Sequence, residues 1–222
     1  MIKIVNIMSK ELLLASRSGY ETFMPIVYLI LIMTFFNVAI SYVSNDIIVE
    51  LVPLMIWVSC LLICILNLET VFKDDFDDGS LELFIIHSGV IEFEILAKIF
   101  AHWVLSNLPV VIIAPLIALG LGVTTNTSLI LFLSLLVGTP SMSLIGAIAA
   151  ALTVSLRKNK ILISLMVLPL YLPILIFATS AVSNSYFNLN YETELLMLVI
   201  LLLIFILIAP LACSKALRIS LD

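Results

Sequence analysis

The sequence has little charge. Only 11% of its 222 residues are charged, whereas 63% are hydrophobic and the mean hydropathy is +1.29. A soluble domain carries about 25% charged and about 45–50% apolar residues. One core could not bury this much apolar surface in a soluble globule of this length. We therefore expect residues 1–222 to form a single all-α integral membrane domain.

Other residue types are scarce in ways that exclude functions. Three cysteines are too few for a disulfide framework. None of the seven glycines is followed by lysine, so the chain cannot form a phosphate-binding P-loop. If the protein uses ATP, another chain must bind it, and we expect a non-catalytic subunit. A net charge of −5 argues against nucleic acid as a partner.

The apolar residues fall into six stretches, each long enough for a helix that crosses about 30 Å of hydrocarbon. Because lipid offers no hydrogen bonds to the backbone, we predict that all six are helices. The predicted spans are Thr22–Tyr42, Ile48–Leu68, Ile95–Leu119, Leu129–Val154, Ile161–Val182 and Leu195–Cys213.

The middles of these spans contain no Asp, Glu, Lys or Arg. Carriers that move protons or couple to ions usually need such groups at mid-membrane, so their absence argues against a secondary transporter. No channel-filter motif is present either.

All ten basic residues lie in alternate connections or at the termini. The positive-inside rule then places both termini in the cytoplasm, as expected for six spans. The basic residues are Lys3, Lys10, Arg17, Lys73, Lys98, Arg157, Lys158, Lys160, Lys215 and Arg218.

The N-terminal residues 1–19 have the pattern of an amphipathic helix. Lys3, Lys10 and Arg17 recur every seven residues on one face, and apolar residues follow a three-to-four spacing on another. Such a helix lies in the plane of the membrane surface. An ordinary frayed terminus is the alternative.

The connection at residues 69–94 holds eight of the fifteen acids. Asp78-Gly79 is a turn signal, and Ser80 can cap a short helix over Leu81–Ser88. A short capped helix between two spans is suited to docking into a groove on a cytosolic partner. The alternative is a solvated acidic loop whose helix packs on its own bundle. The loop lacks the spacing of an EF-hand, which argues against a metal site at its four aspartates, Asp74, Asp75, Asp77 and Asp78.

Spans three to five are rich in proline and small residues. Gly138-Thr139-Pro140 is expected to interrupt span four, and Ser143, Ala147 and Ala151 then form a stripe that allows close helix approach. We also expect prolines to bend spans three and five, at Pro109, Pro115, Pro169 and Pro173. This pattern is compatible with a transport path, a subunit interface or a tightly packed bundle.

Two residue types could ligate haem or metal. His102 precedes Trp103 near the end of span three, where a hydrogen-bonding interfacial histidine is the ordinary interpretation and axial haem ligation is the alternative. Cys60 and Cys64 are one turn apart and are interpreted as small packing residues.

Several strings in the sequence resemble the CcmB family, the haem exporter proteins B of cytochrome c maturation. The resemblance covers nearly the whole chain and agrees with its length and six-span plan. Its most specific part is E-T-V-F-K-D-D-F-D-D-G-S-L-E at Glu69–Glu82. Further matches are Leu96–Trp103, Leu108-Pro109, Gly138-Thr139-Pro140, Leu168–Leu170, Ile176–Thr179 and Ala216–Ser220.

This resemblance implies the permease subunit of an ABC-type complex. Family members pair with a separate ATPase, CcmA, and work with CcmC, CcmD and the haem chaperone CcmE. A second copy of the permease is also implied. The resemblance assigns the ATPase-docking, or coupling, role to the acidic segment, namely Asp74, Asp75, Asp77, Asp78, Gly79, Ser80, Leu81 and Glu82.

The resemblance implies two possible functions for the complex. ATP hydrolysis by the partner drives either haem export or release of the haem-loaded chaperone, and this chain binds no cofactor tightly. A non-transporting membrane scaffold and a generic exporter permease for another substrate are the alternatives.

Overall fold

The computed structural model describes residues 20–40, 42, 44–68, 70–81, 91–155 and 160–221. These residues form helices and no strand. The helices are α2 (Tyr20–Ala39), α3 (Asn45–Asn67), α4 (Thr70–Asp77), α6 (Ile91–Ser106), α7 (Leu108–Gly120), α8 (Thr125–Thr153), α9 (Lys160–Tyr186) and α10 (Glu192–Leu221).

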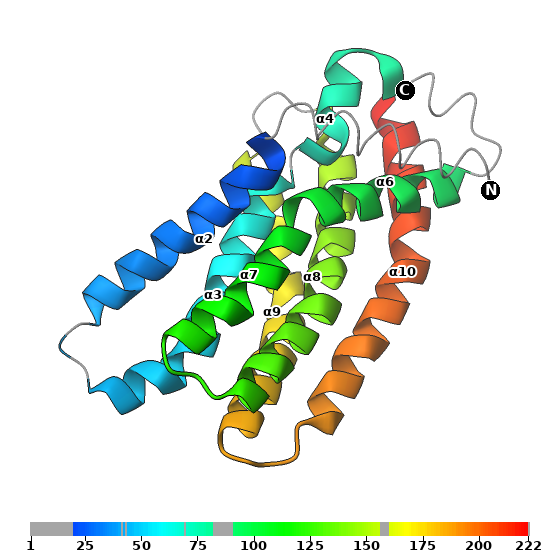
Figure 1. Cartoon of the computed structure of the whole chain (residues 1–222). Coiled ribbons are helices and arrows are strands. Elements are labelled where there is room, and N and C mark those ends of the chain that lie inside the picture. Colours follow the sequence, from blue (N-terminus) through cyan, green and yellow to red (C-terminus); the bar gives the residue numbers. More distant parts are fainter. Residues whose placement is uncertain are drawn as a thin grey trace.

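The long helices stand side by side, and α4 lies at one end of the bundle (Figure 1). In the described part of the chain, five stretches are long and apolar enough to cross a membrane, and Phe23–Ala39 is a shorter apolar helix. The prediction of an all-α membrane protein is confirmed. The predicted interfacial helix at 1–19 lies outside the described residues.

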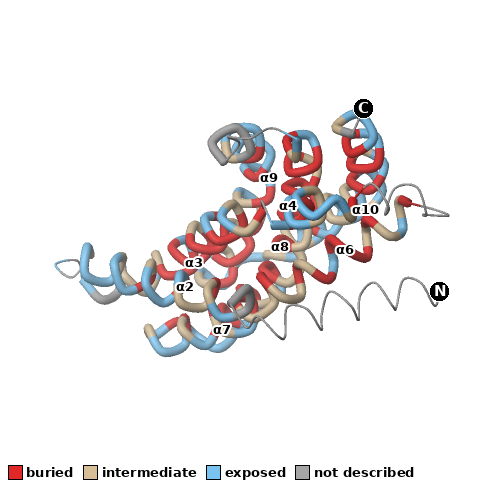
Figure 2. The backbone as a smooth tube through the Cα atoms, turned by 90° about the horizontal axis from the view of Figure 1, so that it is seen from above, coloured by how far each residue is buried: buried red, intermediate tan, exposed pale blue. Residues whose placement is uncertain are grey.

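Helix α8 stands in the middle of the bundle, as the view from the α4 end shows (Figure 2). Its small residues allow this position. A Cβ added to Gly146 would lie 1.9 Å from Leu68 Cδ2, and one added to Gly138 would lie 2.5 Å from the ring of Trp57. The predicted small-residue stripe is therefore a packing surface, with Ala147 and Ala151 fully buried.

The expected interruption of span four at Gly138-Thr139-Pro140 is wrong. Helix α8 continues through these residues as a single helix. Thr139 Oγ1 donates to the carbonyl of Leu135, 2.8 Å away, one turn back. Pro140 thus lacks one backbone donor without ending the helix, as proline often does in membrane helices.

The third predicted span is not one helix. It is divided at Asn107 into α6 and α7, and α6 lies across the end of the bundle while α7 runs along it (Figure 1). Pro109 lies within the first turn of α7 and has no backbone N–H with which to continue the ladder from α6. The bend predicted at Pro109 is confirmed. Helical hydrogen bonds still run across the junction, from Asn107 N–H to the Trp103 carbonyl and from Val111 N–H to the Asn107 carbonyl.

The break also separates two hydrophobic clusters. The central cluster joins α2, α3, α7, α8 and α9, with Val111 and Ala114 from α7 fully buried. The second cluster lies toward α4 and joins α4, α6, α8 and α10, with Phe72 and Ile95 in its interior. Helix α8 is the main element that belongs to both.

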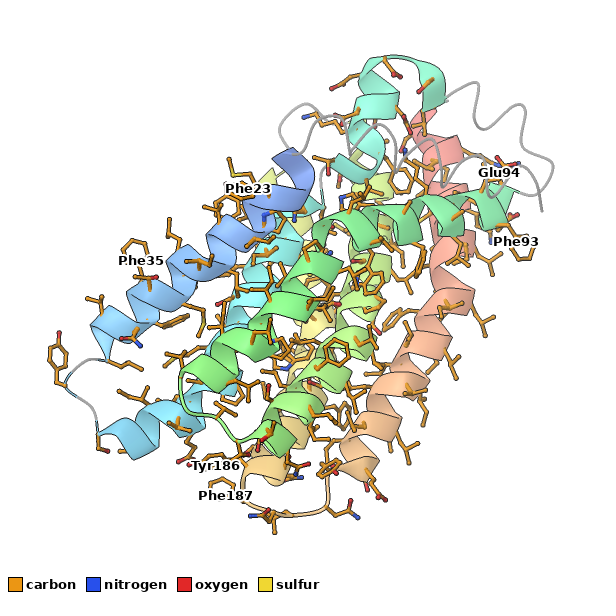
Figure 3. All side chains as sticks on the ribbon, viewed as in Figure 1. Phe23, Phe35, Phe93, Glu94, Tyr186 and Phe187 are labelled. Atoms are coloured by element: carbon orange, nitrogen blue, oxygen red, sulfur yellow. The ribbon has the colours of Figure 1, made fainter. Side chains whose placement is uncertain are left out.

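Large apolar side chains also cover the outside of the bundle. Phe23 and Phe35 project outward from α2, and Phe93 projects from the start of α6 (Figure 3). All three are more than 60% exposed. Lipid covers such surfaces in a membrane protein, so these residues mark the faces of the bundle that contact the bilayer.

Candidate coupling site

Helix α4 is an amphipathic helix that sequence reasoning missed. Val71 and Phe72 are 4% and 1% exposed and belong to the cluster with α6, α8 and α10. Asp74 and Asp77 are exposed on the opposite side. The acidic composition suggested a loop. The signal that could have identified the helix is the spacing of Val71, Phe72, Asp75 and Phe76, which share one helical face.

A tight turn follows α4. Gly79 has φ +77°, a conformation that L side chains rarely adopt. The backbone N–H of Ser80 donates to Asp78 Oδ1 over 2.9 Å, and the Ser80 hydroxyl donates to Asp75 Oδ1 over 3.3 Å. Ser80 itself is helical, so the expected capping role of Ser80 is wrong: Asp78 accepts the hydrogen bond at this turn.

Of the helix predicted over Leu81–Ser88, the structure describes Leu81 alone. Leu81 is helical and 1% exposed, but residues 82–90, Glu82 among them, lie outside the described residues. The structure therefore provides α4 and its turn as the described part of the acidic segment.

An ion pair joins the acidic segment to α6. Lys98 Nζ lies 2.5 Å from Asp75 Oδ2, and the side chains are 9% and 29% exposed. Among the four aspartates of the segment, Asp75 faces the bundle while Asp74, Asp77 and Asp78 are exposed. The aspartates thus divide into one that holds α4 in place and three that are presented outward.

His102 lies one turn beyond Lys98 on α6. Its Nε2 is 3.1 Å from Thr70 Oγ1, at the start of α4. The Thr70 hydroxyl is also 2.9 Å from the carbonyl of Asn67 and donates to it. His102 therefore interacts with the same short helix as Lys98 does.

The next polar residues of α6 reach the interior. Trp103 Nε1 donates to Thr139 Oγ1 on α8 over 2.9 Å, and both residues are buried. At the break, Asn107 Nδ2 donates to Ser143 on α8 over 3.3 Å, and its Oδ1 accepts from the thiol of Cys64 on α3 over 3.1 Å. The sequence pointed to Trp103 only as an interfacial residue.

An apolar cavity of about 550 Å³ lies beside Trp103, between α6, α8 and α10. Its walls include Phe93, Phe100, Pro140 and Leu202, and Ser143 contributes a hydroxyl. Among the described residues that line it there is no His, Cys, Met or Tyr. A ligand here would be held by apolar contact, without an axial bond to a metal.

No group of three or more His, Cys, Asp or Glu among the described residues could hold a metal ion. Cys60, Cys64 and Cys213 are free and buried. Cys60 and Cys64 belong to the central cluster, as their interpretation as packing residues requires.

Comparison with known proteins identifies the family. The CcmB protein family matches residues 2–220. The chain belongs to the CcmB family. It is 39% identical to heme exporter protein B of Haemophilus influenzae, and the alignment covers 98% of each chain. It is 37% identical to the heme exporter proteins B of Pseudomonas aeruginosa and Escherichia coli K12, over 96% of each chain.

The match to the CcmB family includes every element of the site. Helix α4, its turn, α6 and the middle of α8 all lie within the matched residues. The alignments with these relatives cover 96–98% of this chain, so the acidic segment and the long helices lie within the region of similarity.

Proposed function

We propose that this chain is the membrane subunit of an ABC-type complex for c-type cytochrome biogenesis. The ATPase, CcmA, docks on α4 and the turn at Asp78–Leu81. CcmC and CcmD belong to the same complex, and its work serves the haem chaperone CcmE. We also propose a second copy of the chain, as in exporter permeases, and an inner-membrane location with both termini in the cytoplasm.

One observation carries this proposal: the inner face of α4 packs on the bundle, while its outer face is acidic and exposed. Val71 and Phe72 anchor α4 in the cluster, while Asp74 and Asp77 remain exposed at the end of the bundle. A surface helix held this way suits recognition by a basic groove, because complementary charge guides association and orientation. Lys73 is the exposed basic residue within α4.

Haem is proposed as the substrate, on the names of the relatives, rather than as a resident cofactor. The apolar cavity beside Trp103 lacks an axial ligand, and His102 Nε2 is engaged with Thr70. ATP hydrolysis in the partner drives either export of haem or release of the haem-loaded chaperone. Both versions require force to pass from the ATPase to this chain.

The docking surface is tested by co-purification of the ATPase. Replacing Asp74 and Asp77 by Asn removes two exposed charges worth about 0.5 kcal/mol each, so affinity should fall about fivefold. Glu50→Gln with Glu192→Gln is the matched control. These two exposed acids lie near the first residues of α3 and α10, at the end of each helix that is far from α4. The control should retain the partner. Equal ATPase recovery from both double variants would contradict the docking assignment.

A substitution in the turn after α4 should disrupt ATPase docking more strongly. Gly79→Pro cannot adopt φ +77°, because proline fixes φ near −65°. We expect loss of both ATPase recovery and cytochrome c maturation. Gly79→Asn is the control, since Asn tolerates a positive φ better than other residues do. Intact maturation in Gly79→Pro would rule out the turn as a docking element and favour a non-transporting scaffold.

The proposed handling of haem is tested by optical spectra. The purified protein should show no stable Soret band, and His102→Ala should leave the spectrum unchanged. A Soret band that disappears in His102→Ala would instead identify His102 as an axial ligand. If loss of the chain spared c-type cytochromes, a generic exporter permease would be the better assignment.

A further inference from the structure

Four polar side chains form an ordered series along α6 and its end. Lys98, His102 and Trp103 lie in α6 and Asn107 follows it, at spacings of four, one and four residues. The first two interact with α4, and the last two interact with α8. One helix is therefore bonded to the acidic segment at one end and to the central helix of the bundle at the other.

The connection to α4 is short and protected from water. Lys98 is 9% exposed at its side chain, and its ammonium lies 2.5 Å from the Asp75 carboxylate. Removing one partner of a buried ion pair is costly because a charge then remains in a poorly solvated site. The ion pair therefore resists separation, and a displacement of α4 carries Lys98 with it.

The hydrogen bond from Trp103 reaches α8 beside a residue that lacks a backbone donor. Trp103 donates to Thr139, and the next residue, Pro140, has no N–H for the helical hydrogen bond. Sharp changes in helix direction concentrate at proline. A force delivered to Thr139 thus acts on the position in α8 that yields most easily.

The cavity lies at this same position. Trp103 and Phe100 from α6 and Pro140 from α8 form part of its wall, with Leu202 and Ile206 from α10 opposite. A shift of α6 relative to α8 changes the shape of this space. The acidic segment, α6, the proline of α8 and the cavity form one continuous series of contacts.

We propose that Lys98 is a positioning residue that transmits movement of α4, through α6 and the Trp103–Thr139 hydrogen bond, to α8 at Pro140. This inference rests on the proposed function, because it assumes that the ATPase acts on α4. It adds the route by which that action reaches the interior. A claim of coupling between distant sites requires evidence that a change at one site alters the other, and variants of Lys98, Asp75 and Trp103 test this.

The test uses the whole complex in cells that lack the native chain. Lys98→Met removes the charge that meets Asp75, and Lys215→Met is the matched control, since Lys215 is an exposed lysine of α10, outside α4 and α6. We expect the Lys98→Met complex to retain its ATPase and hydrolyse ATP while the yield of c-type cytochrome falls about tenfold. The control should keep all three properties.

Charge reversal separates positioning from general damage. Asp75→Lys and Lys98→Asp alone should each lower the yield, and the two together should recover a large part of it. A merely structural role for Lys98 predicts that ATPase recovery and cytochrome yield fall together in the single variants and return together in the exchange. That result would overturn the inference.

If Lys98→Met does not accumulate in the membrane, two other variants complete the test. Lys98→Arg retains the ion pair and should retain the yield. Trp103→Phe leaves the ion pair intact but removes the donor to Thr139, and it should lower the yield without releasing the ATPase. Normal yield in Trp103→Phe would overturn the proposed route.

The outcomes distinguish the inference from the proposed function. If the unaltered chain binds no ATPase, the proposed function fails. If ATPase binding depends on Asp74 and Asp77 while Lys98→Met and Trp103→Phe mature cytochromes normally, the docking site stands and only the route is wrong.

Discussion

Helices α6 and α7 are consecutive and mostly apolar, yet they have different orientations and surroundings. Helix α6 contains Glu92, Glu94, Lys98 and His102 and lies across the bundle, whereas α7 has no charged, hydroxyl or amide side chain and runs along it. An apolar stretch of 30 residues, long enough to cross a membrane, therefore need not be one straight helix. The polar groups are concentrated in its first half, which takes the different direction.

The two helices also differ in length and partners. Helix α7 has 13 residues, which is about 20 Å, and its buried face packs into the central cluster. Helix α6 contributes to the cluster with α4 and α10. The division at Asn107 lets one sequence segment serve both clusters.

The largest effect should come from abolishing the division itself. In Asn107→Ala with Pro109→Ala, the polar contacts of Asn107 disappear and the helical ladder can continue. We expect a loss of about 3 kcal/mol, seen as a fall of about 10 °C in the unfolding midpoint in detergent. Pro115→Ala, within α7, is the control and should cost less than about 1 kcal/mol. Similar midpoints for the two would show that the break at Asn107 is incidental.

A second, smaller effect compares truncations on the two helices. Ile95 of α6 is fully buried and Ile112 of α7 is 53% exposed. Ile95→Ala should leave a cavity and cost about 2 kcal/mol, whereas Ile112→Ala should cost less than about 0.5 kcal/mol because lipid fills the space. Thermal unfolding in matched detergent measures both. A greater loss from Ile112→Ala would mean that a partner covers this face of α7.

The smallest effect concerns the hydrogen bond between the Trp103 side chain of α6 and α8. Helix α7 bonds to α8 differently, because its Pro115 backbone carbonyl accepts from Ser128. Thr139→Val removes the acceptor of the Trp103 indole, and it should cost about 1 kcal/mol since membrane-protein hydrogen bonds are modest. Thr179→Val is the control: the Thr179 hydroxyl donates to the carbonyl of Leu175 in its own helix, and its loss should cost about 0.3 kcal/mol. Equal costs would mean that Trp103 finds another acceptor.

The spans could be predicted from the sequence because their cause is local. About 20 apolar residues in a row must form a helix in lipid, whatever their neighbours are. The same logic failed at Thr70–Asp77, where four charged residues in eight suggested a loop. Here the burial of Val71 and Phe72 by α6, α8 and α10 stabilises the helix, and that partner surface is distant in the sequence.

The candidate site was only partly predictable for the same reason. The acidic segment was visible as a concentration of charge, and Gly79 as a turn residue. The pairing of Asp75 with Lys98 was not, because the two residues are 23 positions apart and lie on different helices. Which of the four aspartates faces inward depends on the direction of α6, which is set by the break at Asn107.

The length of α10 has a consequence for the bilayer. Its 30 residues extend about 45 Å, about 15 Å more than the hydrocarbon core. Cys213 and Leu217, near its end, lie in the cluster that supports Val71 and Phe72 of α4. In the orientation proposed above, the excess length of α10 would support the acidic surface beyond the hydrocarbon. Longer acyl chains would then bring lipid phosphates closer to Asp74 and Asp77, and we predict that the activity of the proposed complex depends on membrane thickness.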